Sequence, residues 1–305
     1  ALKMLVELNL AYSEGAMEDD KLMLQQFPVE ISQQNIQVLS SMAPNLLLVL
    51  FNIFSLTAPS SRGFVLETID GYLQVIGKGD LENTFNKVCG MFKNALDEEV
   101  EEAANSKNNN NSLKMSATML DLIVAMAKYV PKSSHNALFS ILANGVRLQD
   151  ALLQKRSYRI ITRLPETEEG KNSITQFLGD IESIFVETTE NTQNASRAAR
   201  LTAISEIIDI LPQLDLHFIP AILQEVIMST KDVNERTREE SYKILIAMGH
   251  KMKEGGIIEN GKVPGFDPTT PNSEASLNEY LTMVSAGLAA QAPHMISATI
   301  TALSC

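Results

Sequence analysis

The sequence of 305 residues contains no tryptophan, and aromatic residues make up only 6% of it. Strands favour aromatic and β-branched side chains, so this scarcity argues against a β-sheet protein. The hydrophobic residues, 45% of the chain, include many Leu, Ile, Met and Ala, which are typical of packed helices. Together these observations predict an all-α chain, long enough for two ordinary domains or for one repeat array.

Cysteine is also scarce, with only Cys89 and Cys305 in the chain. They lie far apart and outside any C-x-x-C or Cys/His cluster, which argues against a disulfide framework and a zinc site and fits a reducing compartment. A long hydrophobic run is missing as well, because the most apolar stretch, "PNLLLVLFNIFSL", is shorter than the ~20 residues of a membrane span. We expect this stretch to be a buried helix of a soluble protein with no membrane partner.

Positive charge is in short supply, since 25 basic residues face 37 acidic ones and the net charge is -12. This balance argues against general binding to phosphate backbones. The charge is segregated, however: residues 1–110 carry -8, residues 111–165 carry +6, and residues 166–305 carry -10. Residues 111–165 are called the basic island below.

Within the basic island, Lys155, Arg159 and Arg163 are spaced at intervals of four residues. This spacing places them along one flank of a helix. Two interpretations stay open. The flank is either a solubilising surface of an acidic protein or a contact site for phosphate, as in RNA, or for an acidic partner.

Helical periodicity is the strongest pattern that the sequence does contain. Apolar residues recur at i, i+3, i+4 and i+7 along several segments, for example 174–185 and 219–227. Short breaks rich in Pro, Gly, Asn and Asp separate these segments. Repeated pairs of antiparallel helices of about 40 residues are typical of HEAT proteins. The sequence therefore predicts an all-α, HEAT/armadillo-like α-solenoid of stacked antiparallel helix pairs.

A polar pairing recurs at intervals of 41 residues just before these apolar runs. Its members are Asp150 with Arg156, Asn191 with Arg197, and Asp232 with Arg238. At equivalent turns of a stack, an acidic side chain of one repeat can reach an arginine of the next, so we predict a structural ladder that fixes the register. Two Ser-Tyr pairs, at 157–158 and 241–242, are 84 residues apart instead, which indicates that at least one helix is shifted.

The predicted organisation has five parts. They are divergent helical repeats at 1–104, a loop at 105–112, HEAT repeats with a 41-residue period at 113–253, a projecting loop at 254–273, and a further, truncated helical repeat at 274–305. The chain begins without Met and ends inside an apolar run, which predicts that it is a piece of a longer protein.

Signatures of catalysis are sparse. "GKGD" at 77–80 lacks the spacer and the Ser or Thr of a phosphate-binding loop. The four histidines are scattered without partners at i+4, so capping or surface roles are favoured over metal binding. The acidic groups are typical of solvated helix faces, and the methionines follow the apolar stripes of a core. We expect no enzyme activity, no cofactor and no small-molecule substrate.

Four passages together resemble a specific family. They are "APSSRGFVLETIDGYLQV", "LQDALLQKRSYRIITRL", "VIMSTKDVNERTREESYKILIAMG" and "SAGLAAQAPHMISATITALS". From about residue 44 to the end, the chain resembles the ribosomal RNA processing protein twelve family of nucleolar HEAT-repeat proteins. The resemblance implies a protein of the nucleolus and nucleus, shuttling to the cytoplasm, that joins the small-subunit pre-ribosome and supports rRNA maturation and pre-ribosome nuclear export.

The resemblance also implies its partners, which are pre-ribosomal proteins, precursor rRNA, the Ran GTPase and nucleoporins. The leading hypothesis is a noncatalytic assembly scaffold of the pre-ribosome. The alternative is a karyopherin-like nuclear transport receptor, which would share the fold, the acidic surface and the association with Ran. Because the chain is acidic, we expect contacts with proteins to dominate over contacts with RNA.

Overall fold

The computed structural model describes residues 2–13, 29–105, 114–213, 215–255 and 273–304. These residues form α-helices joined by short turns, with no strand among them, so the prediction of an all-α solenoid fold is confirmed. The chain divides into two compact units, Ala1–His135 and Asn136–Cys305. Most of the predicted loops 105–112 and 254–273 lies outside the described residues.

Unit 1 contains five described α-helices. They are α1 (Leu2–Ser13), α3 (Val29–Leu56), α4 (Gly63–Leu73), α5 (Lys78–Asn105) and α6 (Met115–Met126), with 3-10 turns η1 (Pro59–Ser61) and η2 (Lys132–Ser134). Helices α1, α3 and α4 pack against one another, and α6 packs on α5, α3 and α4. Every residue of α6 except Met115 and Asp121 is buried, so this apolar helix is the centre of the unit.

Two polar side chains hold α6 in place. Glu99 of α5 accepts hydrogen bonds from the Ser116 backbone N–H at 2.9 Å and from the Ser116 hydroxyl at 2.6 Å, which caps the start of α6. Arg62, only 6% exposed, donates to the Thr57 carbonyl at 2.9 Å and to the Thr118 hydroxyl at 3.2 Å. Polar groups that are buried in this way must be paired, so they fix the position of the helix.

Helix α3 corrects one prediction from the sequence. The apolar stretch was expected to be buried, and one face indeed buries Ala43, Leu47, Phe51 and Phe54. The opposite face is exposed along a line that we call the α3 stripe: Val38, Met42, Val49, Ile53 and Leu56, each between 43% and 88% exposed. By length and composition alone, Ser32–Leu56 could cross a membrane, a test that packed core helices also meet. Neighbouring helices cover only one face of α3, so its other apolar face stays exposed.

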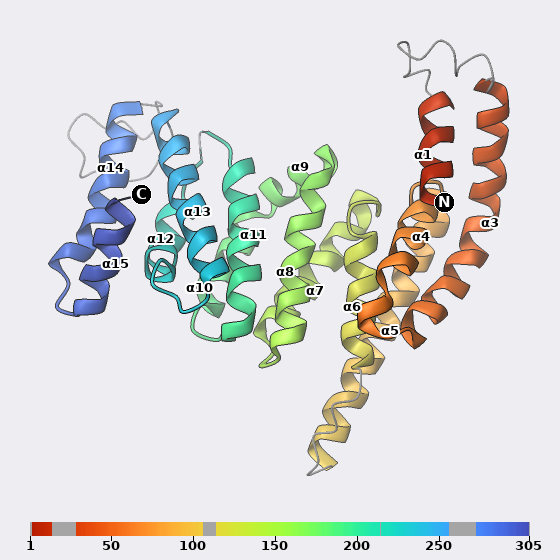
Figure 1. Cartoon of the computed structure of the whole chain (residues 1–305), viewed down its shortest axis with the longest axis horizontal. Coiled ribbons are helices and arrows are strands. Elements are labelled where there is room, and N and C mark those ends of the chain that lie inside the picture. Colours follow the sequence, from red (N-terminus) through yellow and green to blue (C-terminus); the bar gives the residue numbers. More distant parts are fainter. Residues whose placement is uncertain (1, 14–28, 106–113, 214, 256–272, 305) are drawn as a thin grey trace. The chain divides into compact units, whose positions relative to one another are not determined.

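Unit 2 contains nine described α-helices (Figure 1). They are α7 (His135–Arg147, which starts at the last residue of unit 1), α8 (Ala151–Arg163), α9 (Glu168–Gln176), α10 (Leu178–Thr188), α11 (Arg197–Ile210), α12 (Phe218–Ser229), α13 (Glu235–Lys253), α14 (Ser273–Ser285) and α15 (Pro293–Leu303). Three short 3-10 turns accompany them, η3 (Leu164–Glu166), η4 (Asn194–Ser196) and η5 (Ala286–Ala289).

The helices of unit 2 form two layers. Helices α8, α11, α13 and α14 lie side by side in one layer, and α10, α12 and α15 form the other (Figure 1). In the pair α12/α13, α12 lies in the layer of α10 and α13 in the layer of α8 and α11. In the pair α14/α15 the order is the opposite, because α14 packs on α13 and α15 packs on α12. The last pair therefore reverses the order of the layers.

The core of unit 2 contains a line of aromatic rings. Tyr158 of α8 lies edge-on to Phe185 of α10 at 5.6 Å, and Phe185 lies edge-on to Phe218 of α12 at 6.0 Å. Edge-to-face pairs of this kind add to the stabilisation that burial already provides. Helix α7 approaches α8 so closely that a Cβ at Gly145 would lie 1.9 Å from the Ser157 hydroxyl, so only glycine fits there.

The helix starts show how the repeats align. Helices α8, α11 and α13 begin at Ala151, Arg197 and Glu235, so their starts do not follow equal intervals of 41 residues. Asp150 and Asn234, 84 residues apart, are the equivalent N-caps of α8 and α13. The spacing of the two Ser-Tyr pairs therefore gives the structural alignment. The intervals between the starts of α8, α11 and α13 differ because the turns before these helices differ in length.

Candidate functional site

The predicted ladder residues take up several different roles. Asp150 caps α8, because its carboxylate accepts hydrogen bonds from the Leu152 and Leu153 N–H groups at 2.9 Å each. Asp232 joins two repeats, since its Oδ2 accepts from Nη1 of Arg197 at 3.0 Å. This contact is a bridge of the predicted kind between neighbouring helix pairs. Arg197 is half exposed, so the bridge stabilises the stack only modestly.

Arg238 bonds within its own repeat. Its Nη1 donates to the backbone carbonyls of Asp232 at 2.8 Å and Val233 at 3.1 Å. The arginine thus closes the turn before α13, while the Asp232 carboxylate reaches the neighbouring repeat. Asp232 Oδ1 also accepts from the Asn234 N–H at 2.8 Å, which orients the carboxylate.

Gln154 connects α8 to the turn that contains Asn191. This fully buried side chain donates to the Asn191 carbonyl at 3.0 Å and to the Leu148 carbonyl at 2.8 Å, and accepts from the Gln193 N–H at 2.9 Å. Asn191 therefore takes part in this connection between repeats through its backbone carbonyl. An amide can donate and accept at once, which explains why a glutamine serves here.

A buried arginine that the sequence reasoning missed crosses the core of unit 2. Arg200 of α11 is fully buried and forms a bidentate pair with Glu225 of α12 at 2.6 and 2.8 Å. It also donates to the Tyr158 hydroxyl of α8 at 2.9 Å, the Thr188 hydroxyl at 3.0 Å and the Phe185 carbonyl of α10. Burial by itself lowers the pKa of Arg200, but the hydrogen bond and charge of Glu225 outweigh this and hold the pKa above its ordinary value.

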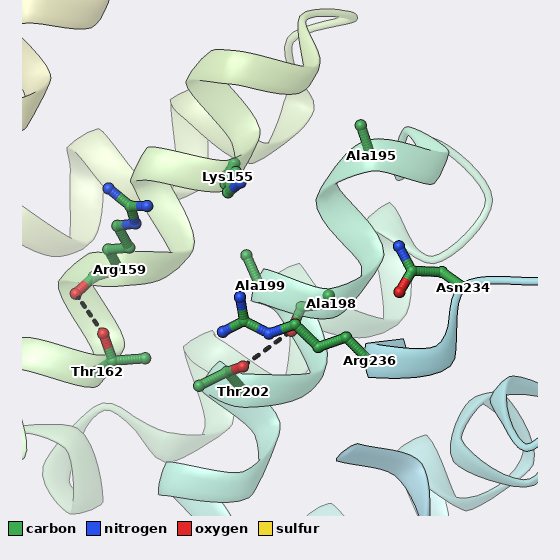
Figure 2. Close-up of a pocket in the computed structure, with 9 residues that line it drawn as sticks. All are labelled: Lys155, Arg159, Thr162, Ala195, Ala198, Ala199, Thr202, Asn234 and Arg236. Carbon is green, nitrogen blue, oxygen red and sulfur yellow. Dashed lines mark hydrogen bonds between the residues drawn. The ribbon is translucent and has the colours of Figure 1, made fainter. Parts of the chain in front are cut away.

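The basic island contributes to a groove across α8, α11 and α13 (Figure 2). The groove has a volume of about 350 Å³, and we call it the basic groove. Lys155 and Arg159 of α8 line one side, and Arg236 from the start of α13 lines the other. All three side chains are exposed, so the groove presents cations from two helices that are not adjacent in sequence.

The floor of the basic groove is made by α11 and the turn before it. Its residues are small: Ala195 of η4, together with Ala198, Ala199 and Thr202, which share one face of α11. The Thr202 hydroxyl is bonded to the Ala198 carbonyl at 2.9 Å, so the floor presents mostly methyl groups. A floor of this kind allows another backbone to approach closely.

Of the three predicted contact residues, two line the basic groove and one does not. Arg163 pairs with Glu166 of η3, three residues further along the chain. Arg236 contributes the third cation in its place, and sequence reasoning missed it because it lies outside the basic island. The signal that could have found Arg236 is the 84-residue alignment of α8 with α13, which brings the start of α13 level with the start of α8.

The outer face of α11 changes charge along its length. Beyond Thr202, the same face carries Glu206 and Asp209. Burial raises the pKa of Glu206, and the negative charges of Asp209 and Glu166 raise it further. Asp209 and Glu166 are therefore both close enough to repel the Glu206 carboxylate. The face of α11 that forms the floor of the basic groove thus becomes acidic beyond Thr202, and we call this part the acidic end.

A metal site would require a cluster of ligand side chains within the described ranges. Within these ranges, no three His, Cys, Asp or Glu side chains lie close enough to hold a metal ion. The partly buried thiol of Cys89 has its pKa raised to about 12 by burial, so it is a poor nucleophile. The basic groove has charged and small side chains that suit binding rather than chemistry.

Fold and groove together define a class: a HEAT-type α-solenoid with a charged groove on one layer of its helices. A family model described as ribosomal RNA-processing protein 12, HEAT repeats, matches residues 1–57. The chain is 46% identical over 306 aligned positions to ribosomal RNA-processing protein 12 of Saccharomyces cerevisiae. The match covers 100% of this chain and 25% of the yeast protein.

Vertebrate relatives show the same relationship. The human RRP12-like protein is 25% identical over 271 positions, which cover 87% of this chain and 19% of that protein. The RRP12-like protein of Gallus gallus is 24% identical over 268 positions, covering 86% and 18% respectively. The chain belongs to the ribosomal RNA-processing protein 12 family. It spans about a quarter or less of the length of these relatives.

Proposed function

We propose that this chain is part of a noncatalytic scaffold that assembles the small-subunit pre-ribosome in the nucleolus. In this role it supports rRNA maturation and the nuclear export of the particle. The observation that carries the proposal is the 46% identity, over the whole chain, to a yeast protein named for ribosomal RNA processing. The repeat architecture supports it, because stacked helix pairs offer long surfaces to several partners.

The basic groove is the surface through which this part of the scaffold acts. Cations on α8 and α13 attract an anionic partner, and the small residues of α11 let that partner approach. The expected partners are pre-ribosomal proteins, with precursor rRNA, the Ran GTPase and nucleoporins in addition. The expected setting is the nucleolus and nucleus, with passage to the cytoplasm.

Affinity isolation of the full-length protein at moderate salt tests this function. A scaffold should sediment with pre-ribosomal particles and enrich small-subunit precursor rRNA. Charge reversal in the basic groove, as Lys155→Glu, Arg159→Glu and Arg236→Glu together, should weaken this association without changing the circular-dichroism spectrum. Full-length protein that sediments apart from all precursor rRNA would contradict the scaffold.

The second candidate is a karyopherin-like transport receptor, which the solenoid fold and the net charge of -12 also suit. A receptor should bind a basic localisation peptide and release it when GTP-loaded Ran is added. Release of bound peptide by GTP-loaded Ran, without enrichment of precursor rRNA, would favour this function over the scaffold.

A further inference from the structure

The basic groove is built as a channel with two walls and a floor. Lys155 and Arg159 form one wall and Arg236 the other, while the floor between them is the small-residue face of α11. From Ala195 to Asp209 this face extends about 20 Å, at 1.5 Å per residue. That length corresponds to roughly four turns of a helix.

The floor favours a helix as the occupant. Alanine and threonine side chains allow two helices to pack at the short end of the usual range of about 8–10 Å between axes. A helix lying on α11 would project its two flanks towards α8 and α13. Lys155 and Arg159 lie on one side of this helix and Arg236 lies on the other. Both flanks of the occupant should therefore carry carboxylates, spaced three or four residues apart so that they share one face.

The acidic end of the channel sets a second requirement. Glu206 and Asp209 continue the helix face beyond Thr202, and Glu166, the partner of Arg163, lies within the electrostatic reach of Glu206. An occupant that spans the whole face must place positive or neutral groups there. The complementary ligand is therefore bipolar, acidic over one half and basic over the other.

This charge pattern disfavours RNA. A nucleic-acid strand carries negative charge at every nucleotide, so its phosphates would meet the carboxylates at the acidic end. The nine residues that line the groove include no aromatic side chain on which a base could stack. The net charge of -12 adds a long-range repulsion of any polyanion.

We propose that the basic groove docks a bipolar amphipathic helix of a protein partner. The acidic half of that helix lies between Lys155 and Arg159 on one side and Arg236 on the other, and its basic half lies against Glu206 and Asp209. The proposal rests on the scaffold function above for the setting in which this partner is met. The chemistry of recognition comes from the groove itself.

The test measures binding of three fluorescent ligands to the full-length protein. The first is an alanine-based helical peptide of about 18 residues, long enough to cover the face. It carries glutamates on both edges of one face in its first half and lysines in its second half. The second peptide has the same composition with glutamate and lysine alternating along its length. The third ligand is a single-stranded RNA of about 15 nucleotides.

The bipolar peptide should bind more tightly than both other ligands. The triple variant K155E/R159E/R236E should lower the affinity for the bipolar peptide by about tenfold or more, since three favourable pairs become repulsive. A matched variant, K231E/K243E/K253E, makes the same change of charge at exposed lysines that do not line the groove. This variant should lower the affinity for the bipolar peptide by about twofold or less. Equal losses in the two variants would overturn the proposal.

Changing the acidic end separates a protein ligand from RNA. The variant E206K/D209K should weaken the bipolar peptide and strengthen any binding of RNA, because only the peptide uses these carboxylates. A second variant, A195L/A198L, fills the floor without changing the charge, and it should weaken the peptide by about fivefold or more. RNA bound more tightly than the peptide, or no peptide binding by a folded protein, would overturn the proposal.

These outcomes are distinct from failure of the scaffold function. If the protein binds the peptide but does not sediment with precursor rRNA, the scaffold function is contradicted and the proposed docking of a helix in the basic groove is supported. Sedimentation that survives in K155E/R159E/R236E and A195L/A198L, with peptide binding lost in both, would show that the particle is held by other surfaces.

Discussion

The two units of the chain bury and expose different kinds of surface. In unit 2, buried polar side chains tie neighbouring helices together, as Gln154 and Arg200 do. In unit 1, the α3 stripe leaves large apolar side chains uncovered, with Leu56 88% exposed. Polar ties specify which helix lies next to which, whereas an apolar face accepts any apolar neighbour. Polar ties of this kind also hold α6 in unit 1, through Arg62. What distinguishes unit 1 is the α3 stripe, an apolar surface that can bind a further apolar neighbour.

The largest expected effect comes from breaking the arginine network of unit 2. Replacing Arg200 with Met should lower the free energy of unfolding by about 3 kcal/mol or more, because the mostly buried Glu225 loses its charge partner and the Tyr158 hydroxyl keeps only Thr192. Urea denaturation followed by circular dichroism measures the loss. The double variant R200M/E225M should recover part of it, since it removes both charges together. No recovery would show that packing, rather than the ion pair, carries the effect.

Removing the amide of Gln154 should have the next largest effect. The change Gln154→Leu leaves the Asn191 carbonyl and the Gln193 N–H without this partner, at a cost of about 2 kcal/mol. Gln149→Leu is the matched control, because Gln149 bonds to the Gln193 side chain at the surface. It should cost about 0.5 kcal/mol or less. Equal costs would mean that Gln154 acts as a surface contact.

The buried arginine of unit 1 allows a direct comparison with Arg200. Arg62 lies 3.9 Å from the Asp121 carboxylate and 4.7 Å from the centre of the Phe54 ring. Its charge partner is therefore looser than the bidentate Glu225. Arg62→Met should cost about 1–2 kcal/mol, mainly through the hydrogen bonds to Thr57 and Thr118. A loss as large as that of R200M would show that both units depend equally on buried charge.

The α3 stripe should affect association and not stability. The double variant V49Q/I53Q removes exposed apolar area from α3, so it should reduce the binding of a hydrophobic dye and any self-association seen by sedimentation. The free energy of unfolding should change by about 0.5 kcal/mol or less, as for other surface positions. The matched substitution Leu47→Gln places an amide in the core and should destabilise the unit. Equal destabilisation by V49Q/I53Q would mean that the stripe is packed.

The smallest effect concerns a surface ion pair. Arg147 of α7 donates to both carboxylate oxygens of Glu187 at 3.0 and 2.7 Å, and these hydrogen bonds lower the pKa of Glu187. A carboxyl group whose pKa is lower in the folded state stabilises the fold above its unfolded pKa. This contribution is lost as the pH falls through the folded pKa. Glu187→Gln should therefore lower the melting temperature slightly at neutral pH and not in acid. A pH-independent difference would contradict the pairing.

The sequence predicted most of the helices of unit 2 but not how they meet. The apolar periodicity located α12 and most of α10, although the predicted segment 174–185 also covers the end of α9. Asp150 was singled out as a ladder residue, and its role as the cap of α8 emerged only from the structure. Arg200 was missed because an arginine in a helix is usually exposed. Its position four residues before Ile204, on the apolar stripe of α11, was the available signal. Arg236 required the repeats to be aligned first. One-sided exposure of α3 depends on its neighbours and cannot be read from α3 alone.

Arg200 has a consequence for how the stack comes apart. In repeat proteins with contacts only between neighbours, end repeats fray one at a time while the remainder stays folded. Arg200 is bonded to α8, α10 and α12 together, so three successive helix pairs share one set of bonds. Opening any of them exposes the same guanidinium. We therefore expect the amide protons of α8, α10, α11 and α12 to exchange with solvent as one cooperative block, whose opening free energy falls uniformly in R200M.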